Sequence, residues 1–163
     1  MKKTIFIILA ICPILFSVSS SKPNTVKKKI HTPILVESKP VSVISPDCIL
    51  IEALIEVESL GNDSAIGDRH LIGEEAVGAL QIRPIMVREV NRILRLKGSK
   101  IRYTRKDRFT RKKSIEMFLI WKEFHHKDSD FEKIARNWNG GPAGFKKSRT
   151  EGYWLKVEAE LNK

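Results

Sequence analysis

Signals that start and stop helices recur from residue 46 to the C-terminus, and they restrict this part of the chain to short helices joined by polar turns. Pro46 and Pro84 suit the first turn of a helix, whereas Ser45, Thr110, Asp130 and Thr150 are residue types that cap a helix N-terminus. Glycine-containing stop signals follow three of these starts, at Gly61, Gly98 and Gly140. The predicted helices cover approximately residues 46–60, 84–98, 110–126, 130–138 and 150–163.

The predicted fold class follows from these helices and from the segments between them. Residues 62–78 are polar and contain glycine, which is compatible with a loop or a small β-hairpin. Residues 47–163 are therefore expected to form a mainly α domain with one small irregular or β-hairpin region after the first helix. A domain of this size buries a modest hydrophobic core.

The N-terminal segment is expected to direct export. Met1 to Lys3 is a short basic start, residues 4–18 are almost wholly apolar, and three serines follow at 19–21. The apolar run is shorter than the roughly 20 residues of a membrane-spanning helix. We predict that residues 1–20 are a cleaved signal peptide and that the protein is periplasmic or secreted, with an uncleaved N-terminal anchor as the alternative. Residues 21–46, rich in proline, serine and lysine, are predicted to be a flexible linker.

The charge of the chain narrows its partners. Without residues 1–20 the protein has 28 basic and 19 acidic residues, a net charge of +9. Such a surface favours polyanions, and for an exported protein the anionic cell envelope is the nearest one. The basic stretch from Arg95 to Lys113 contains Tyr103 and Phe109, a combination also found in single-strand nucleic-acid binding. We interpret this stretch as a solvated face with two aromatic core anchors, and we expect no nucleic-acid partner.

The residue types that bind metals give no pattern for a metal site. Only Cys48 remains after the signal peptide, which excludes an intramolecular disulfide and metal sites built on paired cysteines. His125 and His126 are adjacent on a predicted helix, where neighbouring side chains point in different directions. We therefore expect no metal and no cofactor, and we expect the protein to be a monomer.

Glu58 is the carboxylate that the helix pattern singles out. Ile51, Leu54 and Ile55 lie seven, four and three positions before it and share its helix face. Burial on this face and the partial negative charge at the helix C-terminus both disfavour the ionised form, so both raise the pKa of Glu58. A glutamic acid protonated near neutral pH can donate a proton to a leaving oxygen. The alternative is a boundary glutamate whose carboxylate reaches water.

Further motifs follow this glutamate in order. They are Glu58-Ser59, Gly78-Ala79-Leu80-Gln81-Ile82, Trp138-Asn139-Gly140-Gly141-Pro142 and Tyr153. Each motif is weak alone, but the four in order resemble the lysozyme-like superfamily, and most closely the soluble lytic transglycosylases. The family pattern is Glu-Ser, Gly-Leu-Met-Gln, Tyr-Asn-(Ala/Gly)-Gly-Pro and a tyrosine on a late helix. The resemblance spans residues 47–163 and implies a lysozyme-like helical fold that cleaves the β-1,4 bond between N-acetylmuramic acid and N-acetylglucosamine in peptidoglycan.

The resemblance also implies roles for single residues. Glu58 is expected to be the catalytic acid and base, and Gln81 is expected to bind substrate beside the cleft. Asn139 is expected to face the cleft from the turn before Gly140, and Tyr153 is expected to lie near Glu58. Ser59 belongs to the same candidate site, as a support of the helix end. For Gln81 the alternative is a bond to backbone only, and for Tyr153 it is a core position.

Departures from the family pattern leave the reaction type open. Trp138 replaces the usual tyrosine, and the insert from Gly67 to Val77 is longer than usual. Within it, Gly67-Asp68-Arg69 is similar to a stretch of goose-type lysozymes that carries a second acid, whereas Arg83 stands where those lysozymes have another aspartate. We favour a lytic transglycosylase that forms 1,6-anhydromuramic ends. The alternatives are a lysozyme-type hydrolase with Asp68 as second acid and a non-catalytic wall-binding module.

Overall fold

The computed structural model describes residues 45–163. The predicted signal peptide, and the predicted linker up to residue 44, lie outside the described residues, so these boundaries stay predictions. In the described part, five α-helices and three 3₁₀ turns confirm a mainly α protein. The α-helices are α1 (Pro46–Ser59), α2 (Pro84–Leu96), α3 (Arg111–His125), α4 (Phe131–Gly140) and α5 (Glu151–Leu161). The 3₁₀ turns are η1 (Arg105–Phe109), η2 (Gly144–Lys146) and η3 (Ser148–Thr150).

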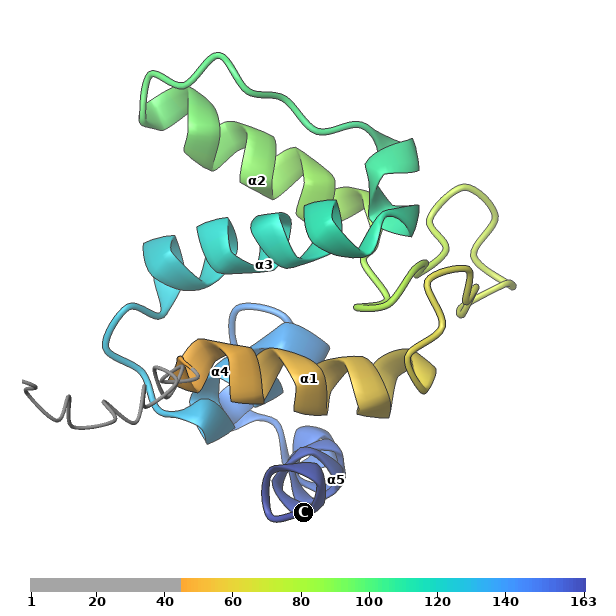
Figure 1. Cartoon of the computed structure of the whole chain (residues 1–163), viewed down its shortest axis with the longest axis vertical. Coiled ribbons are helices and arrows are strands. Elements are labelled where there is room, and N and C mark those ends of the chain that lie inside the picture. The colour runs from red at the N-terminus through yellow and green to blue at the C-terminus, as the bar shows by residue number, and fades with distance from the viewer. Residues whose placement is uncertain (1–44) are drawn as a thin grey trace, which may run out of the picture. The chain divides into compact units, whose positions relative to one another are not determined.

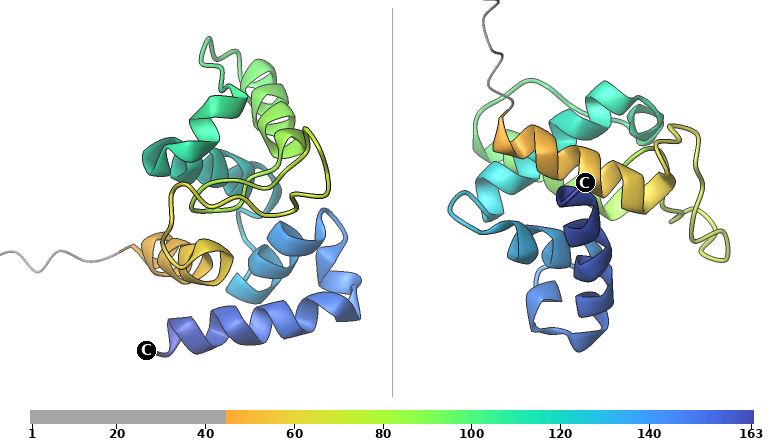
Figure 2. Two further views of the ribbon diagram at one scale, coloured as in Figure 1. Left: turned by 90° about the vertical axis from the view of Figure 1, so that its right-hand side faces the viewer. Right: turned by 60° about the horizontal axis from the view of Figure 1, so that its bottom comes forward.

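The helices form two groups joined by a common core. α2 packs against α3, and α5 packs against both α1 and α4. Figure 1 shows α2 and α3 side by side above α1, and the left view of Figure 2 shows α1, α4 and α5 together on the opposite side. Fully buried side chains from all five helices and from the α1–α2 loop form the core, among them Leu50, Leu80, Val90, Phe118, Ile134 and Val157. Burial of these side chains is the main stabilising contribution to the domain.

The helix boundaries agree with the sequence to within about two residues, but three of the side chains predicted to cap a helix, those of Ser45, Thr110 and Thr150, make no capping bond. Asp130 caps α4, because its carboxylate accepts a hydrogen bond from the backbone N–H of Lys133 at 2.8 Å. Thr110 and Thr150 precede α3 and α5 without a capping bond from their side chains. The Thr150 hydroxyl is instead buried and lies within hydrogen-bond distance of two backbone carbonyls of the preceding turn, those of Gly144 at 2.8 Å and Lys147 at 2.7 Å. The preceding turn thus outcompetes the local cap at this position.

The α1–α2 loop, residues 60–83, has little regular structure. A small hairpin was one of the two possibilities predicted for this segment. The structure has two isolated antiparallel bridges there, Ile66 to Val77 and Val77 to Ile82. Arginines from η1 and the start of α3 hold this loop through its backbone. Buried Arg108 donates to the carbonyls of Glu75 at 2.8 Å and Ile82 at 2.9 Å, and Arg111 donates to the carbonyl of Gly61 and pairs with the Asp63 carboxylate. The loop is therefore fixed by charge-assisted hydrogen bonds rather than by a sheet.

The interpretation of residues 95–113 as a solvated face with two aromatic anchors is wrong in two respects. Arg108, which was expected in solvent, is 6 % exposed, and its aliphatic part and guanidinium lie under the loop. Phe109, which was expected in the core, is 41 % exposed. Tyr103 is buried as expected, and its hydroxyl bonds to the Glu116 carboxylate at 2.9 Å.

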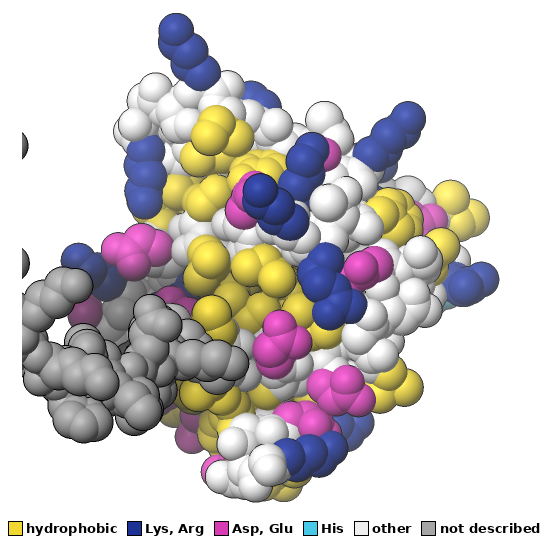
Figure 3. All heavy atoms as spheres, viewed as in Figure 1, with side chains coloured by type: hydrophobic (Ala, Val, Ile, Leu, Met, Phe, Trp, Pro, Cys, Tyr) yellow, Lys and Arg dark blue, Asp and Glu magenta, His cyan; other side chains and the backbone are white. Residues whose placement is uncertain are grey.

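The surface carries both signs of charge. On the face seen in Figure 3, hydrophobic side chains gather near the middle, while lysines and arginines project at the edges with acidic side chains between them. None of the helices in residues 45–163 is both long and apolar enough to cross a membrane.

Gly78 provides a direct test of how tightly the loop is packed. It has φ +80°, and a Cβ atom there would overlap the carbonyl oxygen of Arg108, whereas Gly73 has φ +77° with open space around it. Gly73→Ala therefore tests the cost of the left-handed backbone alone, and it should lower the free energy of unfolding by about 1 kcal/mol. Gly78→Ala adds steric overlap and should lower the free energy of unfolding by about 3 kcal/mol in urea denaturation. Equal losses in the two variants would contradict this packing.

Candidate active site

A cleft of about 930 Å³ runs between the two helix groups. The α1–α2 loop and the start of α2 form one wall, the end of α3 lies at the back, and the end of α4 with the following turn forms the other wall. Its lining includes Glu58, Asp68, Gln81, Glu89, Trp121, His125, His126, Trp138, Asn139 and Arg149. A smaller groove of about 490 Å³ lies between α1 and α5 and includes exposed glutamates. The larger cleft is the candidate site because it holds a shielded carboxyl group.

Glu58 lies in the last turn of α1 and reaches the cleft, as its place on the apolar face of the helix predicts. The Tyr153 hydroxyl, from α5, donates to Glu58 Oε1 at 2.7 Å. These residues are 95 positions apart in the sequence, so only the packing of α1 on α5 brings them together. The bond fixes the orientation of the carboxyl group and leaves its second oxygen available to the cleft.

The electrostatics of Glu58 favour a protonated carboxyl group. Burial raises its pKa from 4.5 to about 7, the Tyr153 hydrogen bond lowers it, and the charge of Asp68 raises it. Burial and the neighbouring Glu58 also raise the pKa of Tyr153 well above its usual value, so the phenol stays neutral and acts as donor. Glu58 can therefore hold a proton at neutral pH and also release it, which suits a group that acts as acid and then as base.

Gln81 lines the cleft beside Glu58 from the α1–α2 loop. Its backbone has φ 44°, and its side-chain amide donates to the carbonyl of Gly78 at 3.0 Å. The amide oxygen lies so close to Gly67 that a Cβ at that glycine would overlap it. Gln81 thus makes the bond to backbone that was the alternative to substrate binding. Its side chain also lines the cleft, so both roles are compatible with the structure.

Ser59 does not line the cleft. Its hydroxyl lies 2.8 Å from the carbonyl oxygen of Ala79 and 3.1 Å from that of Ile55. This arrangement connects the end of α1 to the Gly78–Gln81 segment of the loop. Ser59 therefore supports the position of its neighbours, as expected for the helix end, and has no contact with the cleft as a substrate-binding residue would.

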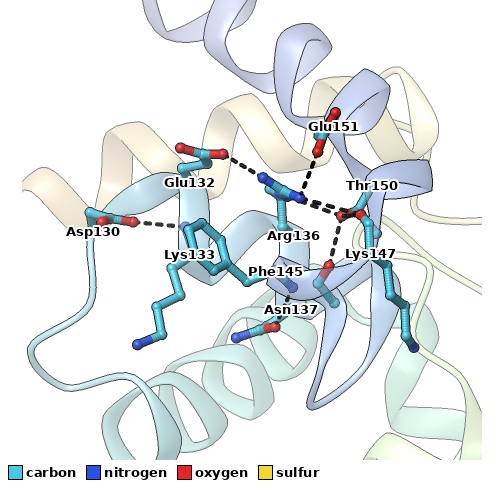
Figure 4. A network of polar contacts seen from close by, with 10 residues as sticks. Asp130, Glu132, Lys133, Arg136, Asn137, Phe145, Lys147, Thr150 and Glu151 are labelled. Carbon is cyan, nitrogen blue, oxygen red and sulfur yellow. Dashed lines mark hydrogen bonds and ion pairs between the residues drawn. The ribbon is translucent and has the colours of Figure 1, made fainter.

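Asn139 lines the opposite wall, from the last turn of α4 rather than from a turn after it, because α4 continues to Gly140. Figure 4 shows how this wall is held: the Arg136 guanidinium lies between α4, the following turn and α5. It pairs with Glu132 at 2.7 Å and donates to the Thr150 hydroxyl at 3.0 Å. Nearby, the Asn137 side chain accepts from the backbone N–H of Phe145 at 2.8 Å. These bonds fix the turn that borders the cleft.

Asp68 also lines the cleft, with an exposed side chain and a backbone φ of 50°. Its charge is one of the causes of the raised pKa of Glu58, so the two carboxyl groups interact electrostatically. Arg83 lines the same wall. In the resemblance to goose-type lysozymes, this is the position at which an arginine stands in place of an aspartate. The described residues thus place one further acid of the α1–α2 loop, Asp68, in the cleft with Glu58.

Aromatic side chains form the back of the cleft. Trp121 and Trp138 pack edge to face with ring centroids 5.1 Å apart, and His126 lies 4.7 Å from the Trp121 ring. Trp121 and His126 are almost fully buried, with 6 % and 7 % of their surface exposed, so the half-buried Trp138 is the ring of this aromatic wall that can pack against the apolar face of a sugar. The helical spacing of Phe118, Trp121 and Phe124 predicts core positions, with stacking of a tryptophan on a sugar ring as the alternative, and Trp121 is buried as that spacing predicts. Phe124, expected beside it in the core, is 41 % exposed.

The contact between Glu89 and His125 at the end of the cleft was not predicted from the sequence. Glu89 of α2 bonds to His125 at 2.7 Å and to Arg92 through two bonds of 2.7 Å. The Arg92 hydrogen bond is the largest cause that lowers the pKa of Glu89, to about 2, so this carboxylate is ionised. The 36 positions between Glu89 and His125 explain why no local pattern indicated this contact.

No metal site accompanies this arrangement within residues 45–163, where no three His, Cys, Asp or Glu side chains cluster closely enough to hold an ion. Comparisons of the chain with known protein families, with curated proteins and with solved structures found no match.

The raised pKa of Glu58 predicts a pH-dependent stability that requires no substrate. The group titrates at about 7 when folded and at 4.5 as a free side chain, so between these values the folded protein binds more protons. Stability should therefore fall as the pH rises from 4.5 to 7. Glu58→Gln removes this loss, so its free energy of unfolding, relative to the parent, should rise between pH 4.5 and 8 in urea denaturation.

Glu52→Gln is the matched control, because Glu52 lies on the same helix with an exposed side chain. Its stability relative to the parent should change little over this pH range. A flat difference between Glu58→Gln and the parent would show that the Glu58 carboxyl group is well solvated in the folded protein.

Proposed function

We propose that this protein is an exported, lysozyme-like enzyme that cleaves the β-1,4 bond between N-acetylmuramic acid and N-acetylglucosamine in peptidoglycan. The observation that carries the proposal is Glu58: a carboxyl group with a pKa raised to about 7, oriented by Tyr153 and facing a long cleft. Glycoside cleavage requires such a group to protonate the leaving oxygen. The order of Glu58-Ser59, Gly78 to Gln81, Trp138 to Pro142 and Tyr153 supports the same family.

The cleft suits a polysaccharide in size and composition. Its volume of about 930 Å³ exceeds that of a single sugar, and the half-buried Trp138 at its back offers an apolar surface to a pyranose ring. Gln81 and Asn139 supply amides on opposite walls, where they can bind acetamido and hydroxyl groups of a strand between them. Peptidoglycan and the anionic envelope are the proposed partners, and the proposed location is periplasmic or extracellular.

In the proposed mechanism the protonated Glu58 first donates its proton to the glycosidic oxygen as the bond to the muramic C1 breaks. Glu58 is then a carboxylate and acts as base. It removes the proton from the C6 hydroxyl of the same muramic residue as that oxygen attacks C1. The product is a 1,6-anhydromuramic end, and Glu58 regains its proton. Tyr153 keeps the carboxyl group oriented in both steps.

A lysozyme-type hydrolase is the second candidate, because Asp68 also lies in the cleft. In that reaction a second carboxylate activates water or attacks the sugar. Asp68 is exposed, whereas Arg83 contributes positive charge to the same wall. We therefore favour the transglycosylase, in which Glu58 alone transfers protons.

Replacement of Glu58 tests the proposed activity. Glu58→Gln keeps the size of the side chain but removes the acidic proton, so the rate of turbidity loss from purified peptidoglycan should fall on the order of 100-fold or more. Glu52→Gln, on the exposed side of the same helix, should retain the parental rate. Near-normal lysis by folded Glu58→Gln would rule out Glu58 as the catalytic acid.

Mass spectrometry of the released fragments tests the reaction type. The transglycosylase mechanism predicts 1,6-anhydromuramic ends without uptake of ¹⁸O from labelled water, and Asp68→Asn should retain at least about a tenth of parental activity because that reaction needs no second acid. Reducing ends that contain ¹⁸O, together with an inactive Asp68→Asn variant, would identify a hydrolase instead.

A further inference from the structure

The charged side chains of the cleft differ in whether the protein already neutralises them. Glu89 is committed to Arg92 and His125 through bonds of 2.7 Å, and Glu58 shares its carboxyl group with Tyr153. Two arginines on the cleft lining have no such commitment. Among residues 45–163, no carboxylate lies within ion-pair distance of Arg83 or Arg149.

Arg83 is held in place without being neutralised. It occupies the N-cap position of α2, between Ile82, whose carbonyl accepts from buried Arg108, and Pro84, the first residue of the helix. Its Nε atom donates to the carbonyl of Glu74 at 3.1 Å. That bond uses one of five N–H groups, so the terminal N–H groups of the guanidinium stay available at the cleft.

Arg149 belongs to the opposite wall. It lies in η3 next to Thr150, whose buried hydroxyl accepts from Arg136 at 3.0 Å and donates to the carbonyl of Gly144 at 2.8 Å. This network, seen in Figure 4, fixes the backbone from which the exposed Arg149 side chain extends to the cleft. The two walls thus each present one guanidinium.

We propose that Arg83 and Arg149 form an anion-binding subsite of the cleft, which selects glycan strands that carry carboxylates over neutral strands of N-acetylglucosamine. A guanidinium presents parallel N–H groups that match the two oxygens of a carboxylate. Muramic acid supplies such a group on its lactyl ether, and a stem peptide attached to it supplies others. The inference rests on the proposed function, because it takes the ligand to be a peptidoglycan strand.

Binding of defined oligosaccharides to the Glu58→Gln protein tests the subsite without turnover. Three ligands are compared by calorimetry at low salt: chitotetraose, a GlcNAc–MurNAc tetrasaccharide with free lactyl carboxylates, and the same tetrasaccharide bearing stem peptides. At least one carboxylate-bearing ligand should bind about tenfold more tightly than chitotetraose, and 0.5 M salt should remove most of this preference. The ligand with the larger preference identifies whether the lactyl or the peptide carboxylate is bound.

Charge-neutral variants connect the preference to these two arginines. The double variant Arg83→Gln, Arg149→Gln should lose the preference, while its affinity for chitotetraose changes little. Arg149→Gln alone should reduce the preference. Because the Arg149 side chain is exposed, this single variant alters no buried contact. Arg95→Gln removes an equal charge from the exposed end of α2, outside the cleft, and should have no effect. A preference that survives in the double variant, or three ligands of equal affinity, would overturn the subsite alone. Failure of all three ligands to bind would overturn the proposed function as well.

Discussion

The buried guanidinium of Arg108 is the constraint on which the cleft depends. The α1–α2 loop has no regular sheet to hold its backbone. The Arg108 guanidinium holds it instead, because it donates to the carbonyls of Glu75 and Ile82. The close approach of Gly78 to the Arg108 carbonyl then fixes the segment that carries Gln81. Burial lowers the pKa of Arg108, but an arginine remains charged at neutral pH, so these bonds stay charge-assisted.

A second arginine, Arg136, holds the opposite wall of the cleft in the same way. That guanidinium crosses from α4 to the turn and α5, and a cation–π contact with Phe145 at 4.8 Å adds to its hydrogen bonds. Between the two fixed walls the Glu58 carboxyl group is removed from much of its hydration, which is the largest cause of its raised pKa. Rigid walls matter here because a mobile wall would let water return to the carboxyl group and lower that pKa.

Much of the helical framework was predictable because its signals are local. Pro46, Pro84 and Asp130 begin helices through their own backbone and side-chain chemistry, and the apolar face of α1 correctly directs Glu58 inward. Most of the features that failed depend on distant partners, and the one at Thr150 depends on a choice between two nearby ones. A buried Arg108 inside a basic run looks like a solvated residue, and the Thr150 hydroxyl has a choice between its own helix and the turn before it. The aromatic wall and the Glu89–His125 pair likewise form only when helices pack.

Because its pKa is raised to about 7, the Glu58 carboxyl group of the folded protein stays protonated close to neutral pH. Carbon-13 NMR of protein labelled at glutamate side-chain carboxyl carbons measures this directly, with the Glu58 signal assigned by its absence from Glu58→Gln. We expect one carboxyl resonance, that of Glu58, to titrate with a midpoint of about 7, well above the ordinary value of 4.5. A Glu58 resonance that titrates at 4.5 or below would contradict it.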